Sequence, residues 1–504
     1  TASLARALVA LGHEVHLLCQ DRGAADLPFV DAVGEWGAGE LRVRVLREPV
    51  RCTAYVPDIG GLLPVYVVDE YEGFRAVPFP ELQDRELDRY LEANVLAVRE
   101  VAGRCRAEVA LANHLIAGPA ILARAVGGGV PYAVKVHGSA LEYTVRPNRD
   151  RFLGLAREGL GPAAAVLVGS GHTAGSLWGL MEDPELPPRT RLGPPGVDVG
   201  AFRPRPLPEA QRRLAALAAR RETSVAAGWG GAVDASSALR ALDPVRGPVV
   251  AYVGKLIVSK GVDLLLAAWP LVVARVPGAQ LCVVGFGTFR GALVRLIEAL
   301  AHGDPAAAGE VARLGRELEG GPRGELRYLA AFLARLERGR LGAPFEDVDY
   351  RAAAPEAFAR VHLTGRLEHE DLPDLLPACS AQVVPSTFPE AFGMVAAEAA
   401  CCGALPVSAS HSGLAEVTAA LAEALPGRLR ALLSFPLDEG AVESIAARLG
   451  EWLLLPTEIR TEATAALAAV ARERFGWESV AEGVLKATAG RLDELPEPVR
   501  TPPT

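Results

Sequence analysis

Two lysines in the segment 254–261, GKLIVSKG, are the first candidates for chemistry. The chain has 52 Lys and Arg residues, of which only four are Lys, at positions 135, 255, 260 and 486. A compact ammonium group on a flexible stem suits an anionic phosphate oxygen, and a flanking glycine lets a ligand approach the backbone. The segment therefore predicts a phosphate site at Lys255 and Lys260. Two solvated lysines at a turn between strand and helix are the alternative interpretation.

The segment 386–398, STFPEAFGMVAAE, is the second candidate. Ser386 or Thr387 is a suitable N-cap and Pro389 suits a first helical turn, so we expect a helix to begin here. The backbone N–H groups of residues 391–394 would then form an anion site at the start of the helix. The segment predicts that a phosphate group binds there.

Glu390 and Glu398 lie eight residues apart in this segment, which is roughly 12 Å along a helix. Retaining glycosidases need two carboxylates about 5 Å apart, so this spacing excludes Glu390 and Glu398 as a catalytic pair of that kind. A nucleotide sugar fits the spacing, with its ribose near one carboxylate, its hexose near the other and its diphosphate between them.

The elements that must position these residues follow from alternating patterns along the chain. Short apolar, β-branched runs alternate with helical stretches rich in Ala, Leu and Arg, which is typical of parallel sheets covered on both faces. This predicts a doubly wound α/β fold. The expected strands are 14–18, 43–46, 109–111, 132–136, 165–168, 249–253, 280–284, 361–364, 381–384 and 404–407.

Ligands of such sheets bind beyond the carboxyl ends of the strands. The residues expected there are Asn113, His114, His137, Gly138, Ser170 and His172 in the first half, and Gly254, Lys255, Gly285, Gly287, Gly365, Arg366, Ser386, Glu390, His411 and Gly413 in the second. Two such crevices facing each other would make one interdomain site.

The domain organisation follows the same patterns. We expect an N-terminal α/β domain at 1–192, a Pro-, Gly- and Arg-rich linker at 193–246, a second α/β domain at 247–438 with a helical insertion at 303–355, C-terminal helices at 439–492 that pack back across the domains, and a disordered tail at 493–504. Between Glu48 and Leu91 the alternation fails, and this segment is expected to be a long irregular loop. Its aromatic residues, among them Tyr71 and Phe74, are candidates for holding an acceptor, with packing of the loop as the alternative.

Composition and charge exclude several classes of protein. A chain of 504 residues that is 50% hydrophobic and 22% charged has enough apolar surface for large cores. The net charge of −9 and the lack of a basic block argue against nucleic acid as a partner. Seven scattered cysteines without CxxC spacing predict neither disulfides nor a zinc site, which fits a reducing cytoplasm. The sequence contains no stretch of about 18 uninterrupted apolar residues, so it predicts no transmembrane helix.

At this point the residues carry a family resemblance. The segments VGKLIVSKGVDLLLAAW, VVGFG, VHLTGRLEHEDLPDLL, PSTFPEAFGMVAAEAACCGALPV and HSGLAEV, in this order, resemble the nucleotide-binding domain of retaining glycosyltransferases of family 4, which have the GT-B fold. The linker segment PPGVDVGAFRP and the segment VHGSALEY are also similar to that family. Lys255 stands where the family has Arg. The family's first strand and Gly-rich loop would precede Thr1, so we expect the sequence to be truncated at its start.

The resemblance implies a fold of two Rossmann-like domains facing an interdomain cleft, and transfer of a sugar from a nucleoside-diphosphate donor with retention of configuration. It implies catalytic roles for His137, Lys255, Lys260 and Glu390, the lysines acting on the leaving diphosphate and no metal or other cofactor being required. It implies donor contacts from Gly254, Arg366, Leu367, Phe392, Gly393, Met394 and Glu398, the last of these on the ribose. The acceptor would be a carbohydrate, a lipid-linked compound or a small molecule, which is compatible with peripheral contact with a membrane.

Two other functions stay open at this point. A nucleotide-sugar epimerase or a phosphorylase has the same architecture, and a non-catalytic nucleotide-sugar-binding protein would have the same second domain. A dinucleotide fingerprint is poorly matched because Arg290 stands where it needs a Gly. The pair Asp347 and Asp349 is the one DxD-like triplet considered for a metal, and it lies in the insertion, away from any strand end. His13, His16, His302, His362 and His369 are interpreted as structural residues.

Overall fold

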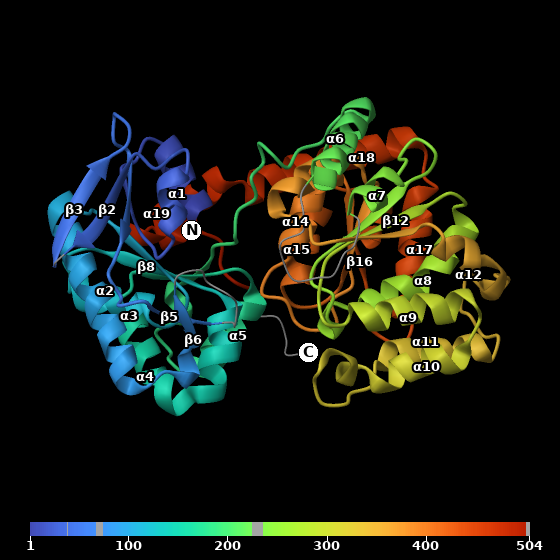
Figure 1. Ribbon diagram of the computed structural model, residues 1–504, viewed down its shortest axis with the longest axis horizontal. Helices are drawn as coiled ribbons and strands as arrows, with labels where there is room; N and C mark the ends of the chain where they lie inside the picture. The colour runs from blue at the N-terminus through green and yellow to red at the C-terminus, as the bar shows by residue number, and fades with distance from the viewer. Residues whose placement is uncertain (38, 67–73, 224–234, 500–504) are drawn as a thin grey trace. The chain divides into compact units, whose positions relative to one another are not determined.

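The computed structural model describes residues 1–37, 39–66, 74–223 and 235–499 (Figure 1). The chain forms two compact units, which are described separately. Unit 1 comprises Thr1–Gly196 and Phe475–Thr504, and unit 2 comprises Val197–Arg474. Both units contain parallel strands with helices packed on their faces, which confirms the predicted α/β class.

In its described residues, unit 1 has two four-stranded sheets and one two-stranded sheet. The first sheet has the order β1 (Val15–Leu18), β4 (Cys52–Val56), β2 (Ala32–Gly37), β3 (Glu40–Val45), and only β3 is antiparallel to its neighbour. The second sheet is parallel throughout, in the order β10 (Thr190–Leu192), β9 (Ala165–Val168), β8 (Tyr132–Val136), β7 (Ala110–Asn113). The two-stranded sheet pairs β5 (Leu62–Val65) with β6 (Arg75–Pro78).

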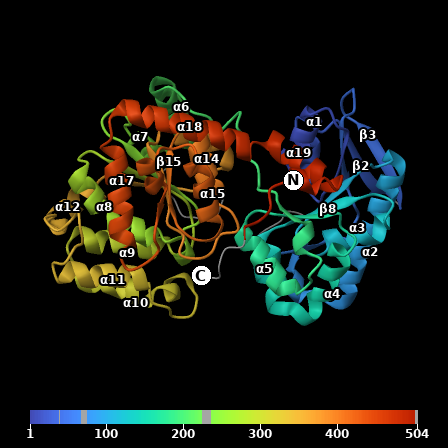
Figure 2. The ribbon, with the colours of Figure 1, turned by 180° about the vertical axis from the view of Figure 1, so that it is seen from behind.

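Strand β8 shows why the second sheet is buried on both faces. Its alternate residues Tyr132, Val134 and Val136 join the larger core, which helices α2 (Asp84–Cys105), α3 (Gly118–Val126), α4 (Arg149–Leu160) and α5 (Gly171–Met181) help to build. Ala133 faces the other way, into a smaller core with α1 (Ala2–Ala10) and α19 (Trp477–Thr488). Figures 1 and 2 show these two helix layers on opposite sides of β8. A strand covered on both faces needs an unbroken apolar run, as YAVKV almost is.

Unit 2 is built on a six-stranded parallel sheet in its described residues. The order is β13 (Val361–Gly365), β12 (Gln280–Val284), β11 (Val249–Val253), β14 (Ala381–Val384), β15 (Leu405–Ala409), β16 (Ser434–Phe435). The chain runs outward from β11 through β12 and β13, then returns to the other side of β11. The strand order therefore reverses between β11 and β14, and the loops after these two strands diverge at a topological switch point.

Helices cover the faces of this sheet. Helices α8 (Val262–Arg275), α9 (Arg290–Ala301), α12 (Tyr350–Phe358) and α17 (Ala441–Leu453) pack on one another, and α10 (Pro305–Leu314) and α11 (Arg327–Glu337) of the insertion pack beside them. Helices α14 (Met394–Cys401) and α15 (Ser412–Ala422) pack on β14 and β15. The remaining helices are α6 (Leu207–Thr223), α7 (Ala235–Arg240), α13 (Leu372–Leu375), α16 (Gly427–Arg430) and α18 (Thr457–Phe475). Trp269 and Trp452 fill the core, and each donates its indole N–H to a backbone carbonyl group.

The segment from Glu48 to Leu91 differs from the expected irregular loop. It contains β4, β5, β6 and the start of α2. Pro64 in β5 and Pro78 in β6 disguised these strands, and both prolines are tolerated because the two strands pair only with each other among the described residues.

The C-terminal tail and the linker also differ from expectation. Residues 493–499 were expected to be disordered, but they pack along β10, where Leu192 N donates to Pro496 O at 2.8 Å. The expected linker 193–246 divides after Gly196, and the rest of it belongs to unit 2 with helices α6 and α7.

All seven cysteines carry free thiols. In the part of the chain that the structure describes, no helix combines the length and apolar character needed to cross a membrane.

Candidate functional site

The candidate site of unit 2 lies at the switch point, on the loops that follow β11 and β14. The loop after β11 carries Lys255 and Lys260, and the loop after β14 carries Glu390. Lys260 Nζ forms an ion pair with Glu390 Oε1, and Ser386 Oγ donates to the same oxygen at 2.7 Å. The side chains of Lys260 and Glu390 are 31% and 24% exposed, so a ligand can reach both. The structure brings together the two segments that the sequence analysis selected separately.

The backbone of Glu390 is held by a chain of hydrogen bonds that begins at His411, in the loop between β15 and α15. His411 Nε2 lies 2.7 Å from Ser386 O and must donate to it, because a carbonyl oxygen only accepts. In the neutral imidazole Nδ1 is then the acceptor, and Ser412 Oγ donates to it at 2.9 Å. Ser412 Oγ in turn accepts from Glu390 N at 2.8 Å. Ser412 adopts the left-handed region at φ +51°, which marks a position held by its surroundings.

The helix that follows begins later than expected. Helix α14 starts at Met394, and Gly393 is its N-cap without a side-chain hydrogen bond. Ser386 does not cap it, since its hydroxyl group binds Glu390 instead. Glu390 therefore lies in the loop rather than in the helix, and the estimate of separation along one helix axis does not apply. The expected anion site moves to the start of α14, where Gly393 leaves the helix N-terminus without a capping side chain.

Glu398 lies one turn into α14 and is 3% exposed. Its Oε1 atom is 2.7 Å from His369 Nε2, and this hydrogen bond raises the pKa of His369 above its ordinary value. The His369 side chain is 67% exposed and its ring lies 5.1 Å from that of Phe202. His369 was expected to be structural, and sequence reasoning missed its contact with a candidate site residue. A His in a short helical turn 29 residues before its partner carries no local signal.

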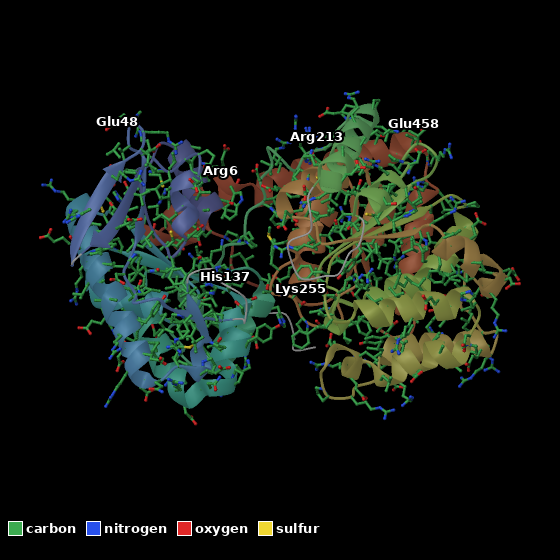
Figure 3. All side chains as sticks on the ribbon, in the orientation of Figure 1. Arg6, Glu48, His137, Arg213, Lys255 and Glu458 are labelled. Atoms are coloured by element: carbon green, nitrogen blue, oxygen red, sulfur yellow. The ribbon has the colours of Figure 1, made fainter. Side chains whose placement is uncertain are left out.

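Lys255 is exposed, and among the described residues it makes no ion pair (Figure 3). Its carbonyl group accepts from the hydroxyl group of the buried Tyr252 at 2.9 Å, which fixes the backbone below the free ammonium group. At the end of β13, Arg366 stacks over Phe286 at 5.3 Å and pairs with Glu368, while Leu367 is buried. These residues border the same end of the sheet.

Chain packing requires the glycines of these loops. A Cβ atom on Gly261 would lie 2.0 Å from Pro385 O, and one on Gly254 would lie 2.8 Å from Tyr252 Oη. A Cβ atom on Gly285 or Gly287 would lie 1.9 Å from Gly254 O or 2.3 Å from Leu256 O. The glycines of VGFG are thus required because the lysine-bearing loop passes directly over them.

Unit 1 gathers polar residues at the carboxyl ends of β7 and β8. Figure 3 labels His137 in this unit. His137 Nε2 lies 3.2 Å from Asn113 Oδ1, and its ring centroid is 4.9 Å from that of His114. His114 has a φ of +71° and stacks on Tyr66 at 4.1 Å. Burial, with a smaller contribution from the neighbouring His114 ring, lowers the pKa of His137 to about 3, and burial lowers the pKa of His114 to about 4. Both imidazoles are therefore neutral at physiological pH.

Other residues selected from the sequence have different places. Tyr71 lies outside the described residues, and Phe74 precedes β6. Tyr66 packs into the core of unit 1, where burial raises the pKa of its hydroxyl group. Asp349 caps helix α12, accepting from Ala352 N at 3.0 Å, which is a structural role. Among the residues that the structure describes, no group of three or more His, Cys, Asp or Glu side chains could hold a metal ion.

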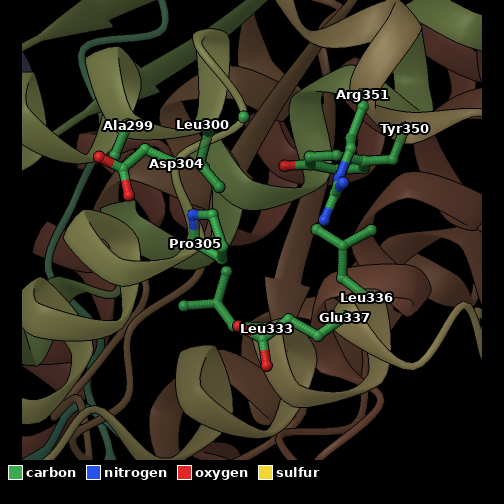
Figure 4. A pocket seen from close by; sticks show the side chains of 10 residues that line it. Ala299, Leu300, Asp304, Pro305, Leu333, Leu336, Glu337, Tyr350 and Arg351 are labelled. Carbon is green, nitrogen blue, oxygen red and sulfur yellow. The ribbon is translucent and has the colours of Figure 1, made fainter.

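A small pocket lies among the helices of unit 2, away from these loops (Figure 4). Leu300, Pro305 and Leu333 line one side of it, and Leu336, Tyr350 and Arg351 line the other. Its volume of 30 Å³ has room for a water molecule or two rather than a nucleotide. It is packing space between α9, α10, α11 and α12.

Comparison with known proteins places the site in context. Residues 342–462 match the family model of glycosyl transferases group 1. The chain is 28% identical over 306 residues to a D-inositol 3-phosphate glycosyltransferase of Segniliparus rotundus, covering 61% of this chain and 48% of that one. The chain thus spans about half the length of the curated relative it matches.

Two solved structures were also compared. HepE of Anabaena in complex with UDP has a TM-score of 0.51 at 15% identity, covering 96% of this chain and 100% of that one. Sucrose-phosphate synthase of Thermosynechococcus elongatus has a TM-score of 0.47 at 18% identity, covering 96% and 98%. The likeness to HepE is one of fold, and the two α/β units have the GT-B fold.

Proposed function

We propose that this chain, which carries a glycosyl transferases group 1 domain on a GT-B fold, transfers a sugar from a nucleoside-diphosphate donor to an acceptor with retention of configuration. One observation supports this most strongly. The Lys260–Glu390 pair stands at the switch point of the unit 2 sheet, one short loop before the helix that contains Glu398. A cation, a helix N-terminus and two carboxylates so placed match a ligand with a central diphosphate and a hydroxylated ring at each end.

In this proposal the diphosphate binds between the lysines and the start of α14. The ammonium groups of Lys255 and Lys260 neutralise the charge that develops on the leaving diphosphate, and the N–H groups of Gly393 and Met394 donate to its oxygens. Phe392 lies in the same loop and is proposed to contact the sugar. The backbone that carries these groups is held by hydrogen bonds at Lys255 O and Ser259 O before the ligand binds, which limits the reorganisation that the reaction requires.

The two carboxylates take the two ends of the donor. Glu390 accepts from hydroxyl groups of the transferred sugar, its orientation being set by Ser386, Ser412 and His411. Glu398 accepts from the ribose hydroxyl groups, in a place where His369 is its partner in the absence of a ligand.

Residues at the neighbouring strand ends take the remaining part of the donor. The backbone at Arg366 and Leu367 is proposed to border the base. Gly254 is proposed to contact the donor from the loop after β11.

The reaction is a single exchange at the anomeric carbon. The bond from that carbon to the diphosphate oxygen breaks as the acceptor oxygen bonds to the same face, and the hydroxyl proton of the acceptor passes to the leaving phosphate oxygen. No carboxylate is proposed as a covalent nucleophile, since the role of Glu390 is to bind sugar hydroxyl groups.

From unit 1 we assign His137 to a hydroxyl group of the substrate. Its Nε2 faces Asn113 Oδ1 and must donate to it, so the neutral ring presents Nδ1 as an acceptor. Tyr71 and Phe74 remain candidates for holding a carbohydrate, lipid-linked or small-molecule acceptor.

The proposal is tested by calorimetric titration with UDP, GDP and ADP, followed by turnover of the corresponding glucose donors. D-inositol 3-phosphate belongs in the acceptor panel because the relative from Segniliparus rotundus is named for it. We expect one nucleotide to bind, product of retained configuration by NMR, and loss of turnover in Glu390→Gln. Glu451→Gln, at an exposed position of α17, is the matched control. Wild-type turnover by Glu390→Gln, or an inverted product, would contradict the proposal.

A further inference from the structure

The helical insertion, to which the sequence analysis gave no chemistry, contributes a carboxylate to the lysine-bearing loop. Glu319 ends a short helical turn, Arg316–Glu319, between α10 and α11. Its Oε2 atom accepts from the backbone N–H of Val258 at 2.8 Å, across 61 residues of sequence. The other carboxylate oxygen lies 3.7 Å from Arg316 Nε, and the Glu319 side chain is 15% exposed. A contact between the insertion and this loop is thus specific and mostly buried.

Val258 begins the three-residue helical turn that ends in Lys260. Its N–H group belongs to the first turn, so no carbonyl group within the turn accepts from it. The Val258 residue is 9% exposed, and a donor buried to this extent is costly without an acceptor. Glu319 supplies that acceptor from outside the loop.

The loop is also held on two other sides. Leu256 N donates to Phe286 O at 2.8 Å on the β12 side. Thr387 N donates to Ser259 O at 2.9 Å on the β14 side. Both contacts come from loops of the sheet itself. Glu319 is the contact from the insertion, and it acts on the turn whose last residue pairs with Glu390.

The insertion loop that carries Glu319 is itself constrained. Gly315 has a φ of +48°, and a Cβ atom there would lie 1.9 Å from Gly324 O. Arg316 N donates to Gly324 O at 3.2 Å, which closes the loop around the turn. A closed loop of this kind presents its carboxylate in one place, which a positioning contact requires.

We propose that Glu319 is a positioning residue that fixes the Val258–Lys260 turn, and thereby Lys260, for the diphosphate of the donor. This rests on the proposed function. Glu319 acts through the backbone, since its carboxylate binds an N–H group and touches neither lysine in the contacts described. Its negative charge opposes an anionic ligand nearby, so only its acceptor role favours binding. The charge and the acceptor can therefore be separated by substitution.

The experiment compares Glu319→Ala, Glu319→Gln and Glu317→Ala in the full chain. Glu317 is the matched control, because it lies in the same turn and is exposed. The readouts are amide hydrogen exchange of residues 256–261, affinity for whichever of UDP, GDP and ADP binds the wild type most tightly, kcat and KM for the donor, and Tm.

We expect Glu319→Ala to speed exchange at Val258 and to weaken nucleoside diphosphate binding about tenfold, the loss of one hydrogen bond to a charged group. Glu319→Gln keeps an acceptor oxygen and should restore affinity to within about twofold of the wild type. Glu317→Ala should match the wild type throughout. A merely structural role would lower Tm in both Glu319 variants without this rescue.

Wild-type exchange and affinity in Glu319→Ala would overturn the inference. Equal losses in Glu319→Gln and Glu319→Ala would also overturn it, because the charge would then be what matters. Wild-type protein that binds none of the three nucleotides would contradict the proposed function and the diphosphate role together. The exchange measurement, made without nucleotide, separately decides whether Glu319 holds the turn.

Discussion

Replacing Lys260 with Met should separate binding from stability. In the unliganded protein Lys260 and Glu390 form a pair whose side chains are 31% and 24% exposed. A pair so open to solvent contributes about 1 kcal/mol or less to the free energy of unfolding. For a unit of this size that is a change of at most about 4 °C in Tm. The substitution should therefore leave a folded protein.

The effect on a bound diphosphate should be larger. Losing one charge-assisted contact with a phosphate oxygen costs about 1.5–3 kcal/mol, or about 10- to 150-fold in Kd. The remaining Glu390 carboxylate adds to this loss, because it keeps Ser386 but no longer has a cation between itself and the anion. A double variant, Lys260→Met with Glu390→Gln, should accordingly bind more tightly than Lys260→Met alone.

The assay is calorimetric titration with the best-binding nucleoside diphosphate at low and high salt, alongside thermal unfolding. Lys486→Met is the matched control, since Lys486 also pairs with a carboxylate, that of Glu494 at 3.5 Å. We expect affinity for the nucleoside diphosphate and the salt dependence of binding to fall in Lys260→Met and to stay at the wild-type level in Lys486→Met. A Kd within about twofold of the wild type, with an unchanged Tm, would refute the assignment of Lys260 to the diphosphate.

Three further predictions follow from other parts of the molecule. Because burial lowers the pKa values of His137 and His114 to about 3 and about 4, the unfolded chain binds protons first as pH falls below 6.5. Unit 1 should thus lose stability on acidification by up to ~1.4 kcal/mol per pH unit for each histidine. Denaturant titrations at pH 7 and pH 5 should show a smaller loss of stability in His114→Gln than in the wild type. An equal loss in the two proteins would count against burial of His114 as the cause. Ser412→Ala removes the acceptor for Glu390 N and puts Ala at a φ of +51°. The value of kcat/KM should therefore fall by about tenfold, with donor affinity less affected. Unaltered kinetics would show that this contact does not orient Glu390. Asp349→Ala should lower the free energy of unfolding by about 0.5–2 kcal/mol through loss of a helix cap. Its turnover should respond to EDTA as that of the wild type does. Turnover that becomes dependent on added manganese would point to a metal role for Asp349 instead.

Strands that are buried on both faces were the easiest elements to predict. The bounds of β8, β9, β11, β12 and β14 are those expected from the sequence. Each is a short, mostly apolar run with at least two valines, and a glycine or proline adjoins it on at least one side. Such a run has few other stable structures. Strands β5 and β6 were missed because a two-stranded sheet tolerates proline, which otherwise argues against a strand.

The residues of the candidate site could be selected from the sequence, but their contacts could not be predicted from it. Lys260 and Glu390 were selected by residue type and by their position after a strand, and both features are local. The roles of Ser412, His369 and Glu319 depend on partners 22, 29 and 61 residues away. Neither hydrophobic periodicity nor a capping pattern indicates contacts between residues so far apart in the sequence. The start of α14 was misplaced for the same reason, because the hydroxyl group of Ser386 bonds to a side chain instead of the helix backbone.

The return of the chain to unit 1 has a consequence for how the molecule is made. Helix α19 closes the smaller core of unit 1, where Ala481, Val484 and Ala487 pack with Leu4, Ala7, Ala133 and Leu167. Synthesis reaches α19 only after the whole of unit 2 has been produced. Unit 2 is continuous in sequence and can complete its own core first.

During synthesis, unit 1 must therefore wait in a partly folded state, with one face of β8 and β9 lacking its last helix. The contacts of α19 with these strands join residues more than 300 positions apart, so closing them is slow compared with forming local helices. An apolar sheet face that stays open for this time is a surface on which chaperones and neighbouring nascent chains compete. Expression yield should accordingly depend strongly on the segment Phe475–Thr504, which returns to unit 1.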